Sequence, residues 1–151
     1  MKSYVTCSTA LIAKLQALEE SAGVPLFDHI YAYHNPKPDG FPCAFVTEKA
    51  GQGQILDTAR NEREWQFEIT LMQDFTGAGR TPAEAAEILR KTVDTVLEAF
   101  DQDPQLKDEH GEPQCMKVKV VPVAFDFGLR EVPYEFARFI VAVVDMVNNY
   151  A

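Results

Sequence analysis

The sequence predicts one α+β domain, with two helices packed on one face of a mostly antiparallel sheet of about five strands. Three observations lead to this fold class. The chain has 151 residues, close to the commonest size of a single domain, so residues 1–151 form one unit. Two segments show the apolar spacing of amphipathic helices, and five show runs or alternation typical of strands. Their order is α-β-β-β-α-β-β, and strands clustered around a crossover helix favour an antiparallel sheet.

The first predicted helix begins at a cap formed by Ser8 or Thr9 and runs to about Glu20. Its apolar residues recur on one stripe, and the opposite side is polar, so we expect the helix to pack on a sheet. A short strand follows over residues 27–33. Residues 34–40 are dense in Pro, Asp, Asn and Gly, a composition that predicts an exposed loop.

Two further strands are predicted before the second helix. Residues 41–48 form the first, with Pro42 at the start, where a missing N–H donor is tolerated. The glycine-rich residues 50–54 are expected to end it. Alternation is cleanest over residues 63–73, which predicts a strand with one buried face. The apolar positions of that strand are Trp65, Phe67, Ile69 and Leu71.

The second helix has the clearest start signal in the sequence. Thr81 and Glu84 form a capping box, and Pro82 occupies the first helical position. The helix is predicted to run to about Phe100, and a polar, turn-rich loop follows over residues 107–113. The positions spaced for one buried stripe are Ala85, Leu89, Val93, Val96 and Phe100.

Two strands close the chain. Residues 116–125 alternate, and Pro122 within them predicts an edge position or a bulge. Residues 127–129 are expected to form a turn or kink. Residues 134–147 form a long apolar strand, which would span roughly 45 Å, well beyond the usual strand length. We therefore expect this strand to bend or to extend past the body of the domain.

The charge balance argues against nucleic-acid and membrane binding. Fourteen basic residues face 23 acidic ones, which gives a net charge of −9. Such a chain repels phosphate backbones and anionic lipid unless its cations cluster. The densest basic pair, Lys117 and Lys119, is interpreted as part of a solvated strand face. The sequence contains no apolar run near the length of a membrane span, and its first residues make a poor signal peptide.

The three cysteines, Cys7, Cys43 and Cys115, are too sparse for a disulfide framework. We expect reduced thiols in a cytosolic compartment, with Cys43 in the core and the other two possible as exposed thiols. No metal site or cofactor is predicted, because the three histidines, His29, His34 and His110, are scattered. The acidic residues 108–112 are interpreted as a loop. Residues 101–103 resemble the start of a calcium loop, but Pro104 and the missing distal Glu argue against one.

No catalytic residue is predicted either. The three serines lie near the N-terminus, and the sequence has no nucleophile-elbow motif. A Cys–His pair that meets only in space stays open. Residues 51–53 and 77–80 resemble short phosphate loops, but the third glycine and the lysine of such loops are missing, so turns are the simpler interpretation.

Two segments are candidates for protein contacts. Residues 57–63 carry charges of both signs and lead into the best strand, and the last strand is long enough to pair with a neighbouring chain. The alternative is that both are guarded, solvated edges. The candidate interface residues are Asp57, Arg60, Arg63, Arg130, Glu131 and Tyr134.

Several segments, taken in order, carry a family resemblance. They are a short N-terminal helix, residues 40–46 (GFPCAFV), residues 61–71 (NEREWQFEITL), a helix that ends near residues 103–106 (DPQL), and two closing strands. Together they cover nearly the whole chain. The arrangement resembles the tail-terminator or tail-completion proteins of long-tailed bacteriophages. Related neck and minor tail proteins share much of this layout.

The resemblance implies a structural protein without catalytic residues or cofactors. Such proteins form a hexameric ring on the head-proximal end of the tail, stop tube polymerisation and present the surface that joins the head. Their partners are the tail tube protein and head–neck proteins, first in the host cytoplasm and then in the virion. An acidic chain suits a ring through which DNA passes, since it does not grip phosphates.

A closed ring needs two different patches on each subunit. Our hypothesis is that residues 57–63 and the exposed end of the last strand belong to those patches. Two alternatives stay open. One is a component of a secretion or contractile injection system related to phage tails. The other is a small α+β enzyme or ligand-binding domain with a polar pocket between helices and sheet.

Overall fold

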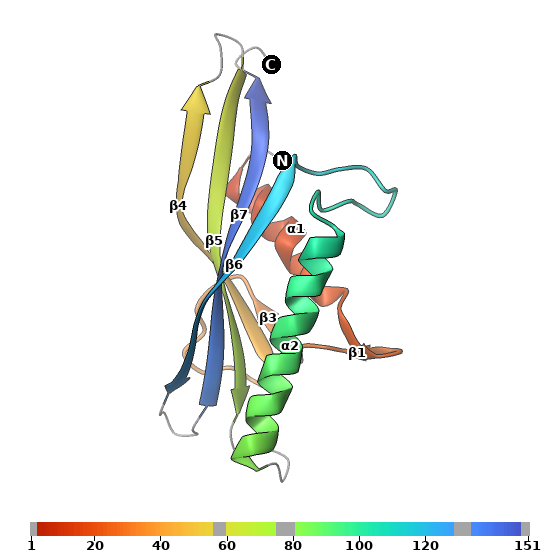
Figure 1. Cartoon of the computed structure of the whole chain (residues 1–151), viewed down its shortest axis with the longest axis vertical. Helices are drawn as coiled ribbons and strands as arrows, with labels where there is room; N and C mark the ends of the chain where they lie inside the picture. Colours follow the sequence, from red (N-terminus) through yellow and green to blue (C-terminus); the bar gives the residue numbers. More distant parts are fainter. Residues whose placement is uncertain (1–2, 56–59, 75–80, 129–133, 149–151) are drawn as a thin grey trace.

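The computed structural model describes residues 3–55, 60–74, 81–128 and 134–148. The chain folds into two helices and a long, twisted sheet (Figure 1). In chain order the elements are α1 (Tyr4–Gln16), β1 (Glu19–Ser21), β2 (Val24–Pro25), β3 (His29–Tyr31), β4 (Cys43–Ile55), β5 (Arg60–Asp74), α2 (Pro82–Gln102), β6 (Lys117–Gly128) and β7 (Tyr134–Asn148).

The main sheet has five strands in the order β3-β4-β5-β7-β6. Its neighbours pair antiparallel except β3 and β4, which run parallel, so the sheet is mixed. The α+β class is confirmed. The predicted order lacks β1 and β2, which form a separate small hairpin. Gly23, at φ 77, makes the turn of that hairpin possible, because glycine adopts positive φ without a steric penalty.

Both helices pack on the same face of the sheet (Figure 1), as the spacing predicts. One apolar cluster joins the buried stripes of α1 and α2 to the inward side chains of β4, β5 and β7. All four apolar positions predicted in β5 and all five predicted in α2 are buried in that cluster or at its border. The domain core therefore lies between the helices and the sheet.

The start of α1 differs from the prediction. Ser3 is the N-cap, and its Oγ accepts a hydrogen bond of 3.1 Å from the backbone N–H of Thr6. Ser8 lies on the buried side of the helix, and the Thr9 hydroxyl donates to the carbonyl of Val5 within the helix. Neither can cap, because each is already inside the helical hydrogen-bond pattern. The helix also ends earlier than predicted, at Gln16.

The start of α2 agrees with the prediction. Thr81 is the N-cap, and its Oγ1 accepts a hydrogen bond of 3.2 Å from the backbone N–H of Glu84. Pro82 is the first residue of the helix, where its missing N–H costs nothing. The helix ends at Gln102, two residues beyond the predicted Phe100.

Several strand boundaries also differ from the predictions: β4 begins at Cys43 rather than residue 41, and β5 covers residues 60–74 rather than 63–73. β3 covers only residues 29–31. β4 does not end at residues 50–54 but continues to Ile55, because a register shift between Lys49 and Gln52 absorbs the glycine-rich stretch as a bulge. Phe127 and Gly128 continue β6 rather than turning, and Leu129 lies outside the described residues. The prediction for Pro122 is confirmed: β6 is an edge strand, and its register shifts between Pro122 and Ala124.

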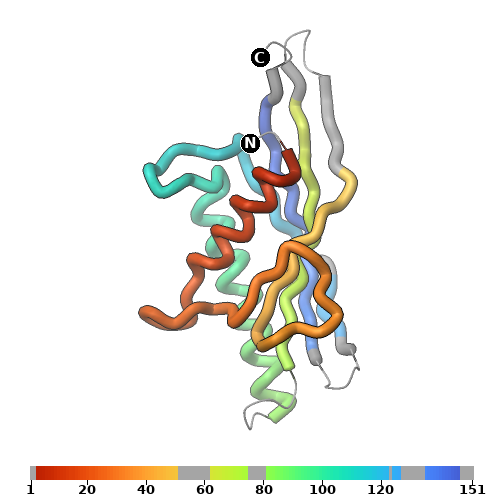
Figure 2. Tube along the Cα trace, turned by 180° about the vertical axis from the view of Figure 1, so that it is seen from behind, coloured from red at the N-terminus to blue at the C-terminus, as the bar shows by residue number. Residues whose placement is uncertain are grey.

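The length of the two central strands decides the shape of the molecule. β5 and β7 have 15 residues each and pair from Arg60–Asn148 to Asp74–Tyr134. At about 3.4 Å per residue each would span roughly 50 Å, against roughly 31 Å for the 21 residues of α2. Figures 1 and 2 show the result: one end of the sheet extends past the helical layer. The expectation that the last strand reaches beyond the domain body is confirmed.

Candidate functional site

The sheet has a second face that carries no helix. Side chains alternate along a strand, so the residues between the core positions of β5 project onto this face. Part of it is covered by the segment after β3. There Cys43, Phe45 and Met72 are buried in a small second cluster. Tyr31 stacks on Phe45 at 5.5 Å between ring centroids, which packs the end of β3 against β4.

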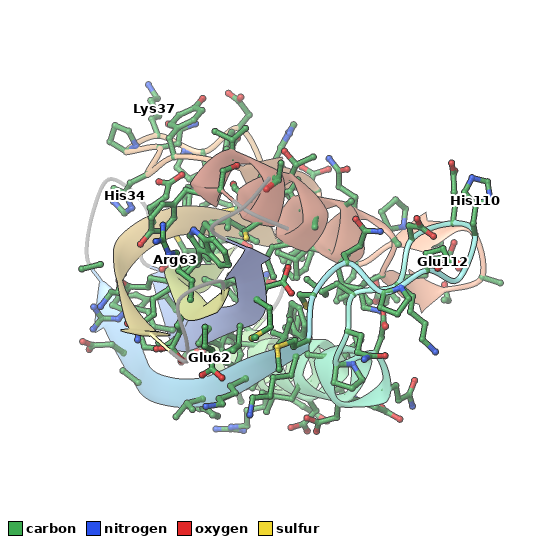
Figure 3. All side chains as sticks on the ribbon, turned by 90° about the horizontal axis from the view of Figure 1, so that it is seen from above. His34, Lys37, Glu62, Arg63, His110 and Glu112 are labelled. Carbon is green, nitrogen blue, oxygen red and sulfur yellow. The ribbon has the colours of Figure 1, made fainter. Side chains whose placement is uncertain are left out.

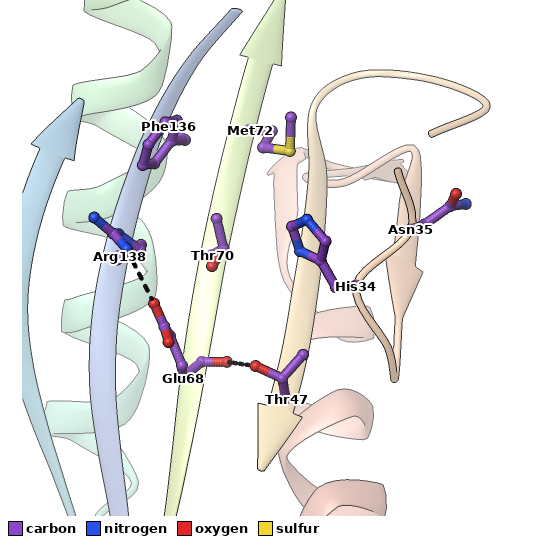
Figure 4. A pocket seen from close by; sticks show the side chains of 8 residues that line it. All are labelled: His34, Asn35, Thr47, Glu68, Thr70, Met72, Phe136 and Arg138. Carbon is purple, nitrogen blue, oxygen red and sulfur yellow. Dashed lines mark hydrogen bonds and ion pairs between the residues drawn. The ribbon is translucent and has the colours of Figure 1, made fainter. Parts of the chain in front are cut away.

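A hollow of about 520 Å³ lies beside this cluster (Figure 4), within the size range of small-molecule sites. Its walls come from β4, β5, β7 and the loop that follows β3, four segments far apart in the sequence. Sheet register places them side by side, since Thr47 pairs with Glu68 and Thr70 pairs with Arg138. The lining residues are His34, Asn35, Thr47, Glu68, Thr70, Met72, Phe136 and Arg138.

Three charges meet at the edge of the hollow. The Glu68 carboxylate lies 3.7 Å from Nη1 of Arg138 and 3.6 Å from Nζ of Lys49. The Arg138 guanidinium also lies over the ring of Phe136, at 5.3 Å from the centroid. Its Nε is buried and has no hydrogen-bond partner. One carboxylate is therefore shared between two cations, and the group carries one net positive charge.

Nothing in the hollow resembles an activated nucleophile. The ring of His34 packs near Phe45, at 5.3 Å between centroids. The three cysteines are free thiols and all are buried, so the expectation that Cys43 is a core residue is confirmed, whereas Cys7 and Cys115 are not exposed. Burial raises the pKa of Cys7 and Cys115 to about 11 and that of Cys43 to about 12. At neutral pH all three remain protonated and unreactive.

The histidines do not come together, as Figure 3 shows for His34 and His110. Over the described residues, no group of three or more His, Cys, Asp or Glu side chains could hold a metal ion. In the acidic loop around His110, the carboxylate of Asp108 accepts hydrogen bonds from the backbone of the loop itself. Asp108 accepts backbone hydrogen bonds of 2.9 Å from both His110 and Glu112, which holds the turn that contains Gly111 at φ 78.

The candidate interface residues fall at two ends of the sheet. Arg60 and Arg63 begin β5 and pair with Asn148 and Asp145 at the end that extends past the helices. The Arg63 side chain is exposed there (Figure 3). Tyr134 begins β7 at the opposite end and pairs with Asp74. Asp57, Arg130 and Glu131 lie outside the described residues.

In the described residues, the space between helices and sheet holds the apolar cluster. Ser8, Gln73 and Thr92 are the buried polar residues of the described chain. Thr92 donates to the carbonyl of Ile88 at 2.8 Å, so its hydroxyl is used within α2. Of the two glycine motifs, residues 51–53 lie inside β4, and residues 77–80 lie outside the described residues.

Sequence reasoning did not find the hollow. Its polar residues on β4 and β5 sit at alternate positions, which fits a solvated strand face equally well. One signal was present: Arg138 is the only charged residue in the apolar stretch from Phe136 to Val144. A charge inside such a stretch marks a position where the sheet face is not packed.

Neither helix of the described chain is both long and apolar enough to cross a bilayer. The comparisons with known proteins leave the family open. No protein-family model matches this sequence, and no curated protein is significantly similar to it.

Proposed function

We propose that this protein is a phage tail terminator: a structural subunit that closes the head-proximal end of the tail tube as a hexameric ring and provides the surface for head joining. The support from the sequence is the ordered resemblance of nearly the whole chain to that family. One structural observation carries the proposal further. The sheet has two different edges, each with a stretch that carries no neighbouring strand in the described residues, and a ring of identical subunits needs two different contact surfaces.

The first edge is β6. In the described residues its only strand neighbour is β7. Near its start the backbone N–H of Val118 donates to the carbonyl of Pro104 at 2.6 Å, so the part of the edge open to another chain lies beyond Val118. Val121 and Phe125 on this strand are 57% and 58% exposed. Edge strands of this kind pair readily with another chain.

The second edge is the outer part of β4. β3 pairs with β4 only from Cys43 to Phe45, which leaves residues 46–55 without a strand on that side in the described structure. The two edges differ in sequence, in length and in the position of their bulges. A contact between β6 of one copy and β4 of the next is therefore heterologous, and six such contacts can close into a ring.

The end of the sheet that extends past the helices supplies a further contact in this proposal. Residues 57–63 lead into it, and Arg63 is exposed on it. In the assembled ring, Arg60 and Arg63 meet carboxylates of the neighbouring copy, and Tyr134 acts at the opposite end; Asp57, Arg130 and Glu131 stay candidate interface residues of the sequence. The net charge of −9 keeps the ring from holding DNA by its phosphates. Its partners are the tail tube protein and head–neck proteins, without cofactor, membrane or sequence-specific nucleic acid, in the host cytoplasm and then in the virion.

The first test is the native mass of the protein, measured by light scattering and native mass spectrometry. The next test is binding of the protein to the ends of tail tubes. Six copies of the 16.9 kDa chain form a particle of about 101 kDa, as expected for a closed heterologous ring. A tight dimer that persists on dilution contradicts the ring, because a dimer is built on one self-complementary patch.

The second test reverses the charge at Arg60 and Arg63 together. We expect the double variant Arg60→Glu, Arg63→Glu to lose the ring, or the binding to tube ends, while the monomer stays folded. A modest fall in melting temperature is expected, because the new carboxylate at position 63 lies opposite Asp145. The control reverses two basic residues of α2, Arg90→Glu with Lys91→Glu, and should assemble normally. If the Arg60, Arg63 variant assembles like the parent protein, these two residues do not belong to the interface.

A further inference from the structure

The hollow on the helix-free face of the sheet is rich in hydrogen-bond donors. Its lining offers the hydroxyls of Thr47 and Thr70, the amide of Asn35 and the ring N–H of His34. The Thr47 hydroxyl donates to the Glu68 carbonyl, but at 3.4 Å this bond is long. The site has many hydrogen-bond donors, and its one carboxylate already interacts with cations. It is therefore complementary to a ligand that carries hydrogen-bond acceptors.

Arg138 is the strongest of these donors. A guanidinium has five N–H groups in a fixed fork, and those of Arg138 are poorly used. Nη1 lies 3.7 Å from the Glu68 carboxylate, beyond hydrogen-bond distance, and Nε is buried without a partner. The Arg138 side chain is 40% exposed, so a ligand in the hollow can accept from its Nη groups, whereas the buried Nε is out of reach.

The charges favour an anion. Glu68 is the one carboxylate of the lining, and it is shared between Arg138 and Lys49. The local balance is one positive charge, in a protein whose net charge is −9. A planar carboxylate fits the guanidinium fork best, because it can accept two parallel hydrogen bonds.

The remaining wall is apolar. Met72 is buried beside the hollow, and Phe136 lies under the guanidinium of Arg138. A ligand whose carboxylate reaches Arg138 can therefore lay a short hydrocarbon stem against Met72 and Phe136. The volume of about 520 Å³ accommodates a group of this size.

We propose that this hollow binds a carboxylate carried on a short apolar stem, with Arg138 as the anchor and Thr47 and Thr70 as additional donors. This proposal does not rest on the ring proposed above, since its anchor Arg138 lies on β7, an inner strand of the sheet; Thr47 is the one lining residue from the open part of the β4 edge. The carboxylate can belong to a free organic acid or to an acidic side chain of a protein, and the test below separates these two sources.

The test is a titration followed by methyl NMR of the intact protein, with labelled Thr and Met methyl groups, a method that also works for a ring. The probes are glutarate and its uncharged analogue glutaramide. We expect glutarate to shift the Thr47, Thr70 and Met72 signals with a dissociation constant of about 1 mM, typical of so small a ligand. Glutaramide should leave them unchanged. Absence of saturable shifts with glutarate overturns the proposal.

Two variants test the anchor. Arg138→Gln should raise the dissociation constant at least tenfold, and Arg138→Lys should recover only part of the loss, because an ammonium lacks the fork. Thr70→Val tests the site without removing a charge and should weaken binding about threefold, the loss of one modest hydrogen bond. The control, Arg90→Gln on α2, should bind glutarate normally. Equal binding by Arg138→Gln and the control overturns the assignment of Arg138.

Two further probes identify the source of the carboxylate. N-acetylglutamate amide imitates a glutamate side chain with its flanking peptide groups. Binding as tight as that of glutarate assigns the site to a protein side chain, whereas tenfold weaker binding assigns it to a free organic acid. Inorganic phosphate brings charge without planarity or a stem. If phosphate binds as tightly as glutarate, the site is a general anion site and the proposed carboxylate specificity is wrong.

Discussion

The hydroxyl of Tyr4 donates a 2.6 Å hydrogen bond to the backbone carbonyl of Lys49, 45 positions further along the chain. The ring of the same tyrosine packs edge-on against Phe67 at 5.6 Å between centroids. Lys49 lies at the bulge of β4, beyond the part of that strand that β3 covers. Tyr4 thus fixes the start of α1 at the level where the sheet begins to extend beyond the helices.

Tyr4→Phe tests this contact. We expect a loss of about 1 kcal/mol in the free energy of unfolding, since the change removes one hydrogen bond and keeps the ring packing. Urea denaturation measures it. The matched control is Tyr33→Phe, because Tyr33 is exposed, and it should change stability by less than about 0.5 kcal/mol. Equal effects of the two variants would show that the Tyr4 hydroxyl contributes nothing.

Lys14 and Asp103 join the two helices through a 3.0 Å ion pair. Burial acts to raise the pKa of the Asp103 carboxyl. Hydrogen bonds from the Lys107 backbone N–H and from Lys14 outweigh burial, so the pKa lies below its ordinary value of 3.8. The stability that this carboxylate contributes is therefore present above pH 3.8 and is lost as the pH falls through the lower, folded-state pKa.

Lys14→Met should accordingly destabilise the protein by about 1 to 2 kcal/mol at pH 7, and the difference from the parent should shrink below pH 4. Denaturation curves over a pH series measure this. Lys91→Met is the control: its partner Glu87 is solvent-exposed on α2, so the cost should stay under about 0.5 kcal/mol. If the loss of stability in Lys14→Met does not depend on pH, it comes from lost packing of the lysine side chain and not from the ion pair.

The buried thiols predict a second pH dependence. Because burial raises the pKa of Cys7 and Cys115 from 9.0 to about 11, the folded state keeps thiols that the unfolded chain ionises. Their contribution to stability is complete below pH 9 and declines as the pH rises towards 11. At pH 8 a thiol reagent should react only slowly with the native protein. After unfolding, the same reagent should react with all three cysteines. Reaction of a native thiol at the rate of free cysteine would contradict the burial.

Two phenylalanines that differ in exposure test the packing of the domain. Phe67 is fully buried between helices and sheet, so Phe67→Ala should cost about 3 to 5 kcal/mol. Phe125 on the edge strand is 58% exposed, and Phe125→Ala should cost about 1 kcal/mol or less in the isolated subunit. Calorimetry of both variants checks the ranking, and a reversed order would contradict the packing described here.

The elements predicted correctly are those whose pattern is local. The alternation around Trp65 and Phe67 defines β5, and the N-cap Thr81 followed by Pro82 defines the start of α2, because in both cases neighbouring residues carry the information. β1 and β2 escaped prediction since all their residues are exposed and show no apolar alternation. The parallel pairing of β3 depends on a partner beyond a long loop. The hollow depends on register between strands, which no local pattern encodes.

The position of β7 has a consequence for how the chain acquires its structure during synthesis. β7 is made after β5 and β6 but lies between them, and its pairs with β5 join residues 60 to 88 positions apart, from Asp74–Tyr134 to Arg60–Asn148. Until it is complete, β5 exposes one whole side of its backbone. Contacts of such long sequence separation slow folding, and an open strand edge invites aggregation in the meantime. This domain is therefore most vulnerable to aggregation just before β7 emerges from the ribosome.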